Sequence, residues 1–173
     1  MDAIVCYPIL ALLTLASATG LTSAPARPHT VLWPKSLYAY SIVVPPGWRT
    51  QQAPEGAAFM VFPPDKSCAI VVTRVEFPEV PALTTDSVAE KAAAGAKIEH
   101  FAPAGTGTIS GIKGKAYSGR LQEDNSTWAI KSTYVQLRPT VWAIEVVKWR
   151  QTATAAQRAA CTAASEGVTL NYH

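Results

Sequence analysis

Short stretches rich in β-branched and aromatic residues recur along the chain and predict β-strands. The predicted strands cover residues 38–44, 57–62, 68–77, 97–101, 128–137 and 140–149, with a hairpin turn inside 108–121 and a short edge strand at 168–170. The run Ala69–Val72 is apolar at every position, which is typical of a strand that is covered on both faces. The sequence therefore predicts a sheet with apolar layers on both sides.

Two segments have the composition of helices. The first begins at Thr85 or Asp86, either of which can cap free N–H groups, and ends near Gly95. The second is the Ala-rich segment 153–166, which Gly167 ends. Strands joined by short turns and separated by these helices predict an α+β fold. We expect a mainly antiparallel β-sheet of about six strands flanked by helices, in an α/β/α-like sandwich.

The strand predicted at 140–149 also indicates coverage on both sides. One of its faces holds Val141, Ala143, Glu145, Val147 and Trp149, and the other holds Trp142, Ile144, Val146 and Lys148. Because side chains alternate between the faces of a strand and both sets are largely apolar, both faces require a cover. We expect helices, or a partner protein, on each side.

A corner follows the first predicted strand, in the segment Tyr40–Trp48. Pro45 and Pro46 cannot donate to a strand ladder, so pairing ends there. Gly47 lets the backbone turn, and Trp48 can then fold back over the sheet. A strand that ends in Pro-x-Gly-Trp at the start of a small mixed domain resembles the PsbP-like superfamily.

The resemblance covers residues 38–170, because the mid-chain helix, the late hairpin and the closing helix also follow in the order of that fold. The superfamily includes Ran-binding Mog proteins, DcrB-like and LpqN-like bacterial lipoproteins, and adaptors and immunity proteins of type VI secretion. It implies a single α+β domain over 38–173 and a structural role for Pro46, Gly47 and Trp48. It also implies a binding function rather than a catalytic one.

The first 26 residues have the composition of a secretory signal peptide. An apolar run over 4–21 is followed by small residues, although no Lys or Arg precedes it. A membrane anchor is the alternative, which Pro8 and the small polar residues disfavour. We expect a periplasmic or secreted protein with no stable membrane span after leader removal. An extended lead-in over 27–37 would follow, with Trp33 lying against the domain rather than in a strand ladder.

Removal of the leader takes away Cys6 and leaves Cys68 and Cys161. An even pair of cysteines in an exported chain predicts a disulfide. A reactive thiol is the alternative, but no His or Lys stands next to either cysteine to activate it. The disulfide would close a long loop, for which the chain-entropy argument predicts a stabilisation of about 4 kcal/mol.

Charge and motif content exclude several function classes. The net charge is +3 and no basic block is present, so binding of nucleic acid has no electrostatic support. His29, His100 and His173 are isolated, and no metal-ligand spacing occurs, so we expect neither a metal site nor a cofactor. No nucleophile stands in a pattern with a base, so we expect no catalytic residues.

Aromatic and arginine side chains remain as a functional resource, because they are enriched at protein interfaces. We expect Trp33, Arg49, Arg74 and Arg138 to contact a partner. The sequence and the resemblance favour a non-catalytic exported bacterial binding protein that acts through protein–protein contact. An immunity protein that neutralises a secreted effector or toxin is one form of this function. An envelope carrier of a small ligand or lipid is the alternative, and an uncharacterised hydrolase is a third candidate.

Overall fold

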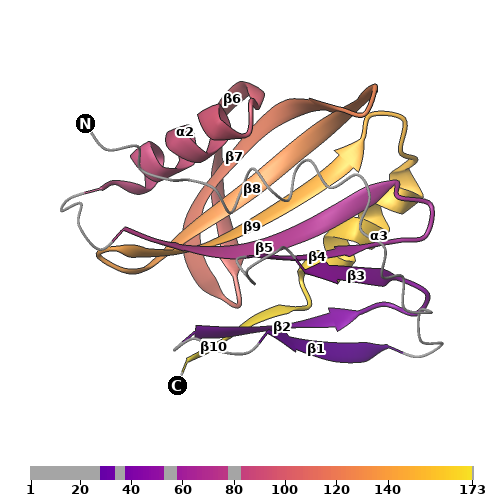
Figure 1. The fold of residues 1–173 in the computed structure, drawn as a ribbon, viewed down its shortest axis with the longest axis horizontal. Coiled ribbons are helices and arrows are strands. Elements are labelled where there is room, and N and C mark those ends of the chain that lie inside the picture. Colours follow the sequence, from indigo (N-terminus) through magenta and orange to yellow (C-terminus); the bar gives the residue numbers. More distant parts are fainter. Residues whose placement is uncertain (1–27, 34–37, 53–57, 78–82, 173) are drawn as a thin grey trace.

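Ten strands and two helices make up the described part of the chain (Figure 1), which in this computed structural model covers residues 28–33, 38–52, 58–77 and 83–172. The signal peptide expected at 1–26 lies outside these residues. Both described helices have 11 residues, and neither meets the length and apolarity that a membrane crossing requires.

Seven of the strands form one antiparallel sheet. In spatial order they are β3 (Arg49–Gln52), β4 (Ala58–Phe62), β5 (Cys68–Glu76), β9 (Val141–Arg150), β8 (Ser126–Arg138), β7 (Ile112–Glu123) and β6 (Glu99–Ile109). Every neighbouring pair is antiparallel. The expected α+β fold with a mainly antiparallel sheet is confirmed, although the sheet has seven strands rather than six.

A second sheet of three strands brings the two ends of the described chain together. Its central strand is β2 (Tyr38–Val44), which lies between β1 (His29–Trp33) and β10 (Val168–Tyr172). Trp33 pairs with Tyr40 in this ladder, so the expectation that Trp33 lies outside a ladder was wrong. The physical reason is that β2 has two edges, and β1 supplies the backbone hydrogen bonds for one of them.

One helix covers each face of the seven-stranded sheet (Figure 1). α2 (Thr85–Gly95) packs against β6, β7 and β8, and α3 (Ala155–Ser165) packs against β5 and β9. We call these sides the α2 face, which includes Trp142 of β9, and the α3 face, which includes Ala143. The three-stranded sheet also packs on the α3 face. The alternation expected within 140–149 therefore separates two buried apolar clusters.

Both helices begin with a capping box. The Thr84 side chain accepts a hydrogen bond from the Ser87 N–H, and the Ser87 side chain accepts one from the Thr84 N–H. Thr154 and Gln157 repeat this arrangement at α3. Such reciprocal bonds satisfy N–H groups that have no partner in the first helical turn. Thr84 is therefore the N-cap of α2, one residue before the start that the sequence predicted.

The corner after β2 carries the chain from the three-stranded sheet to the larger one. Gly47 has a φ of +79°, a conformation that costs glycine little. The Trp48 N–H donates to the Pro45 carbonyl over 3.1 Å, and the Trp48 side chain packs against the α3-face cluster. The polar residues that follow form the edge strand β3.

The disulfide between Cys68 and Cys161 is present, as expected. It joins the first residue of β5 to α3 across 93 residues of sequence, and its Cα atoms are 6.4 Å apart. Both cysteines are buried in the α3-face cluster. The bond therefore fixes the helix to the central part of the sheet.

We expect the paired change Cys68→Ala with Cys161→Ala to lower the free energy of unfolding by about 4 kcal/mol, because the long loop is no longer closed in the unfolded chain. Urea unfolding of this variant and of the oxidised protein measures the difference. An unchanged unfolding midpoint would contradict the prediction. Reduction of the natural protein by dithiothreitol serves as a control for packing effects of the alanines.

The hairpin of β6 and β7 carries two paired glycines. Gly107 and Gly114 lie opposite each other in the ladder, and β6 also approaches β8 beyond it. The end of the hairpin carries Ile109 and Ile112 into the α3-face cluster, and β6 reaches β10 (Figure 1). The end of this hairpin therefore lies over the α3 face of the sheet.

We expect Gly114→Ala to destabilise the protein by about 2 kcal/mol, the cost typical of overpacking. A Cβ at this position would lie 2.1 Å from the backbone oxygen of Tyr134, which cannot move without distorting β8. Thermal and urea unfolding report the loss. Ser118→Ala, at an exposed position of the same strand, is the matched control and should leave stability unchanged.

Candidate functional site

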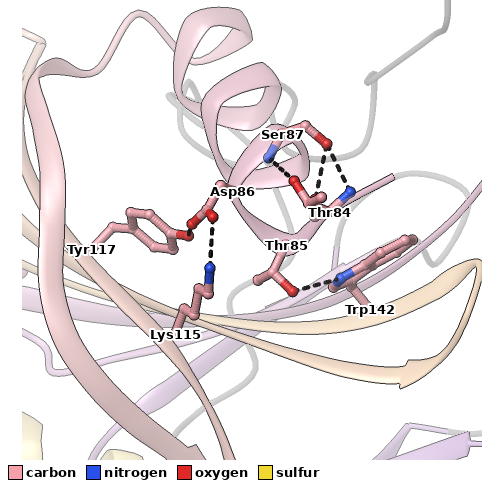
Figure 2. Close-up of polar contacts among 7 residues, drawn as sticks. All are labelled: Thr84, Thr85, Asp86, Ser87, Lys115, Tyr117 and Trp142. Carbon is pink, nitrogen blue, oxygen red and sulfur yellow. Dashed lines mark hydrogen bonds and ion pairs between the residues drawn. The ribbon is translucent and has the colours of Figure 1, made fainter. Parts of the chain in front are cut away.

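A polar cluster joins the N-terminus of α2 to the sheet (Figure 2). Asp86, in the first turn of the helix, accepts hydrogen bonds from Tyr117 Oη and, over 2.6 Å, from Lys115 Nζ. Both donors come from β7. Beside them, Trp142 Nε1 of β9 donates to Thr85 Oγ1 over 3.3 Å. The helix start is thus attached to two different strands.

The electrostatics of this cluster favour a structural role. The hydrogen bond from Lys115, and after it the one from Tyr117, holds the pKa of Asp86 below its usual value. Burial, reinforced by Asp86, raises the pKa of Tyr117 well above that of a free phenol. Tyr117 therefore stays protonated and donates, so it is unsuited to act as a base or a nucleophile. The cluster anchors α2 and offers no catalytic pair.

A second cluster lies at the other end of the α2 face. Lys148 Nζ is 2.6 Å from Glu123 Oε2 and 4.7 Å from the centre of the Trp128 ring. Arg150 Cζ lies 5.4 Å from the same ring. Lys148 is buried, so the carboxylate and the aromatic face compensate its charge inside the protein. In the described part of the chain, Arg150 Nε is buried without a hydrogen-bond partner.

The α3 face holds a different kind of polar pair. Glu145 of β9 and Thr133 of β8 are directly opposite each other in the ladder, and both are buried. Within the described residues, no hydrogen bond or ion pair reaches either side chain. Loss of contact with water raises the pKa of Glu145 to about 7, and the charge of Lys131 opposes this rise only partly.

This pair has no evident structural role. Asp86 and Glu123 each accept bonds from a cation, whereas in the described part of the chain Glu145 is buried among apolar residues and accepts none. A buried carboxyl group whose pKa is raised by desolvation is a common property of functional sites. Glu145 and Thr133 are therefore the candidate functional site that the described structure favours.

We expect Glu145→Gln to stabilise the protein at pH 8 by up to about 3 kcal/mol, at about 1.4 kcal/mol per tenfold change in proton affinity. The folded-state pKa of about 7 lies above the ordinary 4.5, so deprotonation disfavours the folded state. The loss of folding stability caused by ionisation of Glu145 is absent below pH 4.5, the ordinary pKa of the group. The loss grows as the pH rises towards 7 and is complete above pH 7.

Urea unfolding of both proteins at pH 4 and pH 8 measures this dependence. The gain from Glu145→Gln should vanish at pH 4 and appear at pH 8. Glu99→Gln, at an exposed position of β6, is the matched control and should show no such dependence. An equal stability difference at the two pH values would show that the carboxyl group is not desolvated.

The structure places the four expected partner-contact residues on different parts of the protein. Trp33 is in β1, and Arg49 begins the edge strand β3, level with the start of β5. Arg74 lies towards the opposite end of β5, where its guanidinium is 3.9 Å from Glu76. Arg138 is exposed at the hairpin of β8 and β9, near that same end. Only Arg74 and Arg138 share an end of the sheet.

Sequence reasoning did not select Glu145 or Thr133. The signal was present in the alternation of 140–149, where Glu145 is the one charged residue among four apolar residues of its face. Thr133 could not be found in this way, because its position opposite Glu145 depends on the register of β8 and β9. Within the described residues, no group of His, Cys, Asp and Glu side chains could hold a metal ion.

Comparison with known proteins shows the fold. No protein-family model matches the chain, and no curated protein matches it significantly. The solution structure of cyanobacterial PsbP from Synechocystis sp. PCC 6803 matches with a TM-score of 0.57 and 10% identity, over 91% of this chain and 99% of that one. LpqN of Mycobacterium tuberculosis, described as involved in cell envelope biogenesis, matches with a TM-score of 0.51 and 15% identity, over 83% and 91%.

These similarities extend over nearly the whole of both known structures. The chain therefore has the fold of the PsbP-like superfamily, as the corner at residues 45–48 and the order of the elements indicated. At such low identity, the similarity establishes the fold and no more than the fold. Function must be argued from the residues of this chain.

Proposed function

We propose that the protein is a non-catalytic exported binding protein that acts through protein–protein contact. The observation that carries this proposal is how its polar side chains are used. Asp86, Tyr117, Lys148 and Glu123 bind one another or hold secondary-structure elements in place. In the described part of the chain, none of these groups forms a nucleophile–base pair. Polar side chains used in this way stabilise a rigid surface and do not form a reaction centre.

Export is supported by the disulfide and by the leader-like composition of residues 1–26. A protein of the same fold, LpqN, is described as involved in cell envelope biogenesis. A rigid scaffold in the envelope suits a protein that must keep one surface ready for a partner. An immunity protein that covers a secreted effector or toxin is the specific form that we propose.

We expect the protein, produced by export so that its disulfide forms, to capture one stoichiometric protein partner from its own organism. Arg138→Glu should weaken the purified complex by about tenfold or more, because an exposed arginine at an interface contributes through its charge and its planar donors. Arg120→Glu, at an exposed position of β7, is the matched control. Affinity capture with mass spectrometry, followed by calorimetry on the purified pair, gives the result.

Absence of any stoichiometric partner would contradict the proposal. If the partner is an enzyme whose activity falls on binding, the immunity form is supported. If it binds with no effect on activity, the protein–protein function stands and the immunity form is wrong. A complex that Arg138→Glu leaves unchanged would place the interface elsewhere.

An envelope carrier of small ligands is the second candidate, and one observation favours it. Ser132 Oγ and Arg150 Nε are both buried without a hydrogen-bond partner in the described structure. Ser132 lies between Tyr134 and Ile130 of β8, and Arg150 is opposite Trp128, so both are on the α2 face. A bound polar group would satisfy such donors. Native mass spectrometry that shows only the bare chain would argue against this function.

A further inference from the structure

The two helices have the same length and the same capping motif, but they are attached to the sheet in different ways. α2 buries four residues along one face, which are Val88, Ala89, Ala92 and Ala93. Hydrogen bonds to Asp86 and Thr85 add to its attachment. Of the eleven residues of α3, two are buried, Cys161 and Ala164. Because hydrophobic stabilisation grows with the apolar area removed from water, the noncovalent attachment of α3 is the weaker of the two.

Polar contacts add little to the attachment of α3. Among the described residues, Gln157 Nε2 donates to Asp65 Oδ2 over 2.9 Å, in the turn between β4 and β5, and this contact is exposed to water. The Arg158 guanidinium donates to the carbonyl of Ala153, beside the start of the same helix. Exposed hydrogen bonds contribute little to stability, because water competes for the same groups. No ion pair joins α3 to the sheet in this part of the chain.

The disulfide is consequently the main attachment of α3. Cys161 is one of the two buried residues of the helix, and its sulfur is bonded to Cys68 at the start of β5. Cys68 and Trp149 are opposite each other in the ladder, and Ile70 and Val147 are the next pair on the same face. All of these side chains belong to the α3-face cluster or pack against it. An isolated helix of this length is marginal in water, so α3 depends on this contact to stay ordered.

We propose that the bond between Cys68 and Cys161 is a redox switch for α3. Its reduction releases the helix while α2 and the seven-stranded sheet stay folded, and its oxidation docks the helix again. In an oxidising compartment α3 covers its part of the α3 face, whereas in a reducing compartment the apolar residues beneath it are exposed. The switch links the complete surface of the protein to its export, and it does not depend on any partner.

The chemical step is a thiol–disulfide exchange with a dithiol reductant. A thiolate of the reductant attacks one sulfur of the bond, which forms a mixed disulfide and frees the other cysteine. The second thiol of the reductant then displaces the remaining cysteine, so two electrons pass to the protein and two protons complete the two thiols. The reverse step requires a disulfide oxidant, which accepts two electrons as Cys68 and Cys161 lose their protons.

Burial of the two sulfurs makes this exchange depend on movement of the helix. Cys68 is 1% exposed and Cys161 is 0% exposed. A thiolate must approach the sulfur that it attacks, so α3 has to move away from the sheet before reduction begins. The oxidised protein therefore resists brief contact with a reductant. The reduced protein, in which α3 is released, presents both thiols to an oxidant.

A disulfide that acts only on the unfolded chain would behave differently. Its loss would lower the free energy of unfolding, and every protected amide of the protein would exchange faster through the same global opening. If α3 is released, its amides exchange through a local opening that leaves α2 and the sheet intact. Such an opening exposes little surface, so its rate depends only weakly on denaturant.

Amide hydrogen exchange of the exported protein, with and without dithiothreitol, measures this difference. In the oxidised protein, the amides of both helices should be protected. After reduction, the amides of α3 should exchange at least about tenfold faster than those of β5 and β9, and low concentrations of urea should leave their rate unchanged. α2 is the matched internal control, because it has the same length and a capping box but no cysteine.

Two further measurements complete the experiment. Cys68→Ala with Cys161→Ala should reproduce the reduced state, and dithiothreitol should then have no effect. In the reduced natural protein, iodoacetamide should alkylate both cysteines under native conditions, as mass spectrometry of their peptides reports.

The proposal is overturned if α3 keeps its protection after reduction, if α2 and the sheet lose protection together with α3, or if the reduced thiols resist alkylation. In each of these cases the bond is a structural crosslink alone. The proposed binding function would be unaffected, because capture of a partner by the oxidised protein tests it separately.

Discussion

Coverage of both faces of the central strands is the constraint on which the rest of this fold depends. β5 and β9 are buried at almost every position, so neither face of the sheet can be left to water. α2 covers one side, and α3 with the three-stranded sheet covers the other. The capping boxes, the Asp86 cluster and the disulfide hold these covers in place. The Asp86 cluster joins α2 to the sheet, the disulfide joins α3 to it, and the capping boxes stabilise the first turn of each helix.

The two faces are fixed by different chemistry. On the α2 face, the helix start is held by the hydrogen bond from Lys115 to Asp86, which depends on the ionisation of Asp86, and by the hydrogen bond from Trp142 to Thr85. On the α3 face, a covalent bond from Cys68 to Cys161 holds the helix and is independent of pH. Export to an oxidising compartment would leave α3 permanently attached. The attachment of α3 to the sheet is consequently insensitive to pH, whereas the attachment of α2 through Asp86 is not.

Much of the fold could be predicted from local patterns, and the failures have a common cause. The helices, the late hairpin, the two-sided strand at 140–149 and the disulfide follow from residues close in sequence or from the small number of cysteines. The pairing of β1, the edge strand β3 and the length of β6 depend on partners elsewhere in the chain. β6 is especially difficult, since Pro103 and two glycines resemble a loop while register shifts accommodate them in the ladder.

The candidate site shows the same division. Glu145 interrupts an apolar pattern and is visible in the sequence, but only the folded structure shows that no cation within the described residues pairs with it. Glu123 differs in this respect, because the ammonium group of Lys148 forms an ion pair with its carboxylate.

Lys131 is close enough to act on Glu145 through its charge, yet it remains exposed and makes no ion pair with it in the described structure. Folding alone does not account for an acid in this position, because glutamine or an apolar residue would avoid the cost of burying its charge. A residue that lowers the free energy of unfolding and makes no stabilising contact is typical of a position with a binding function.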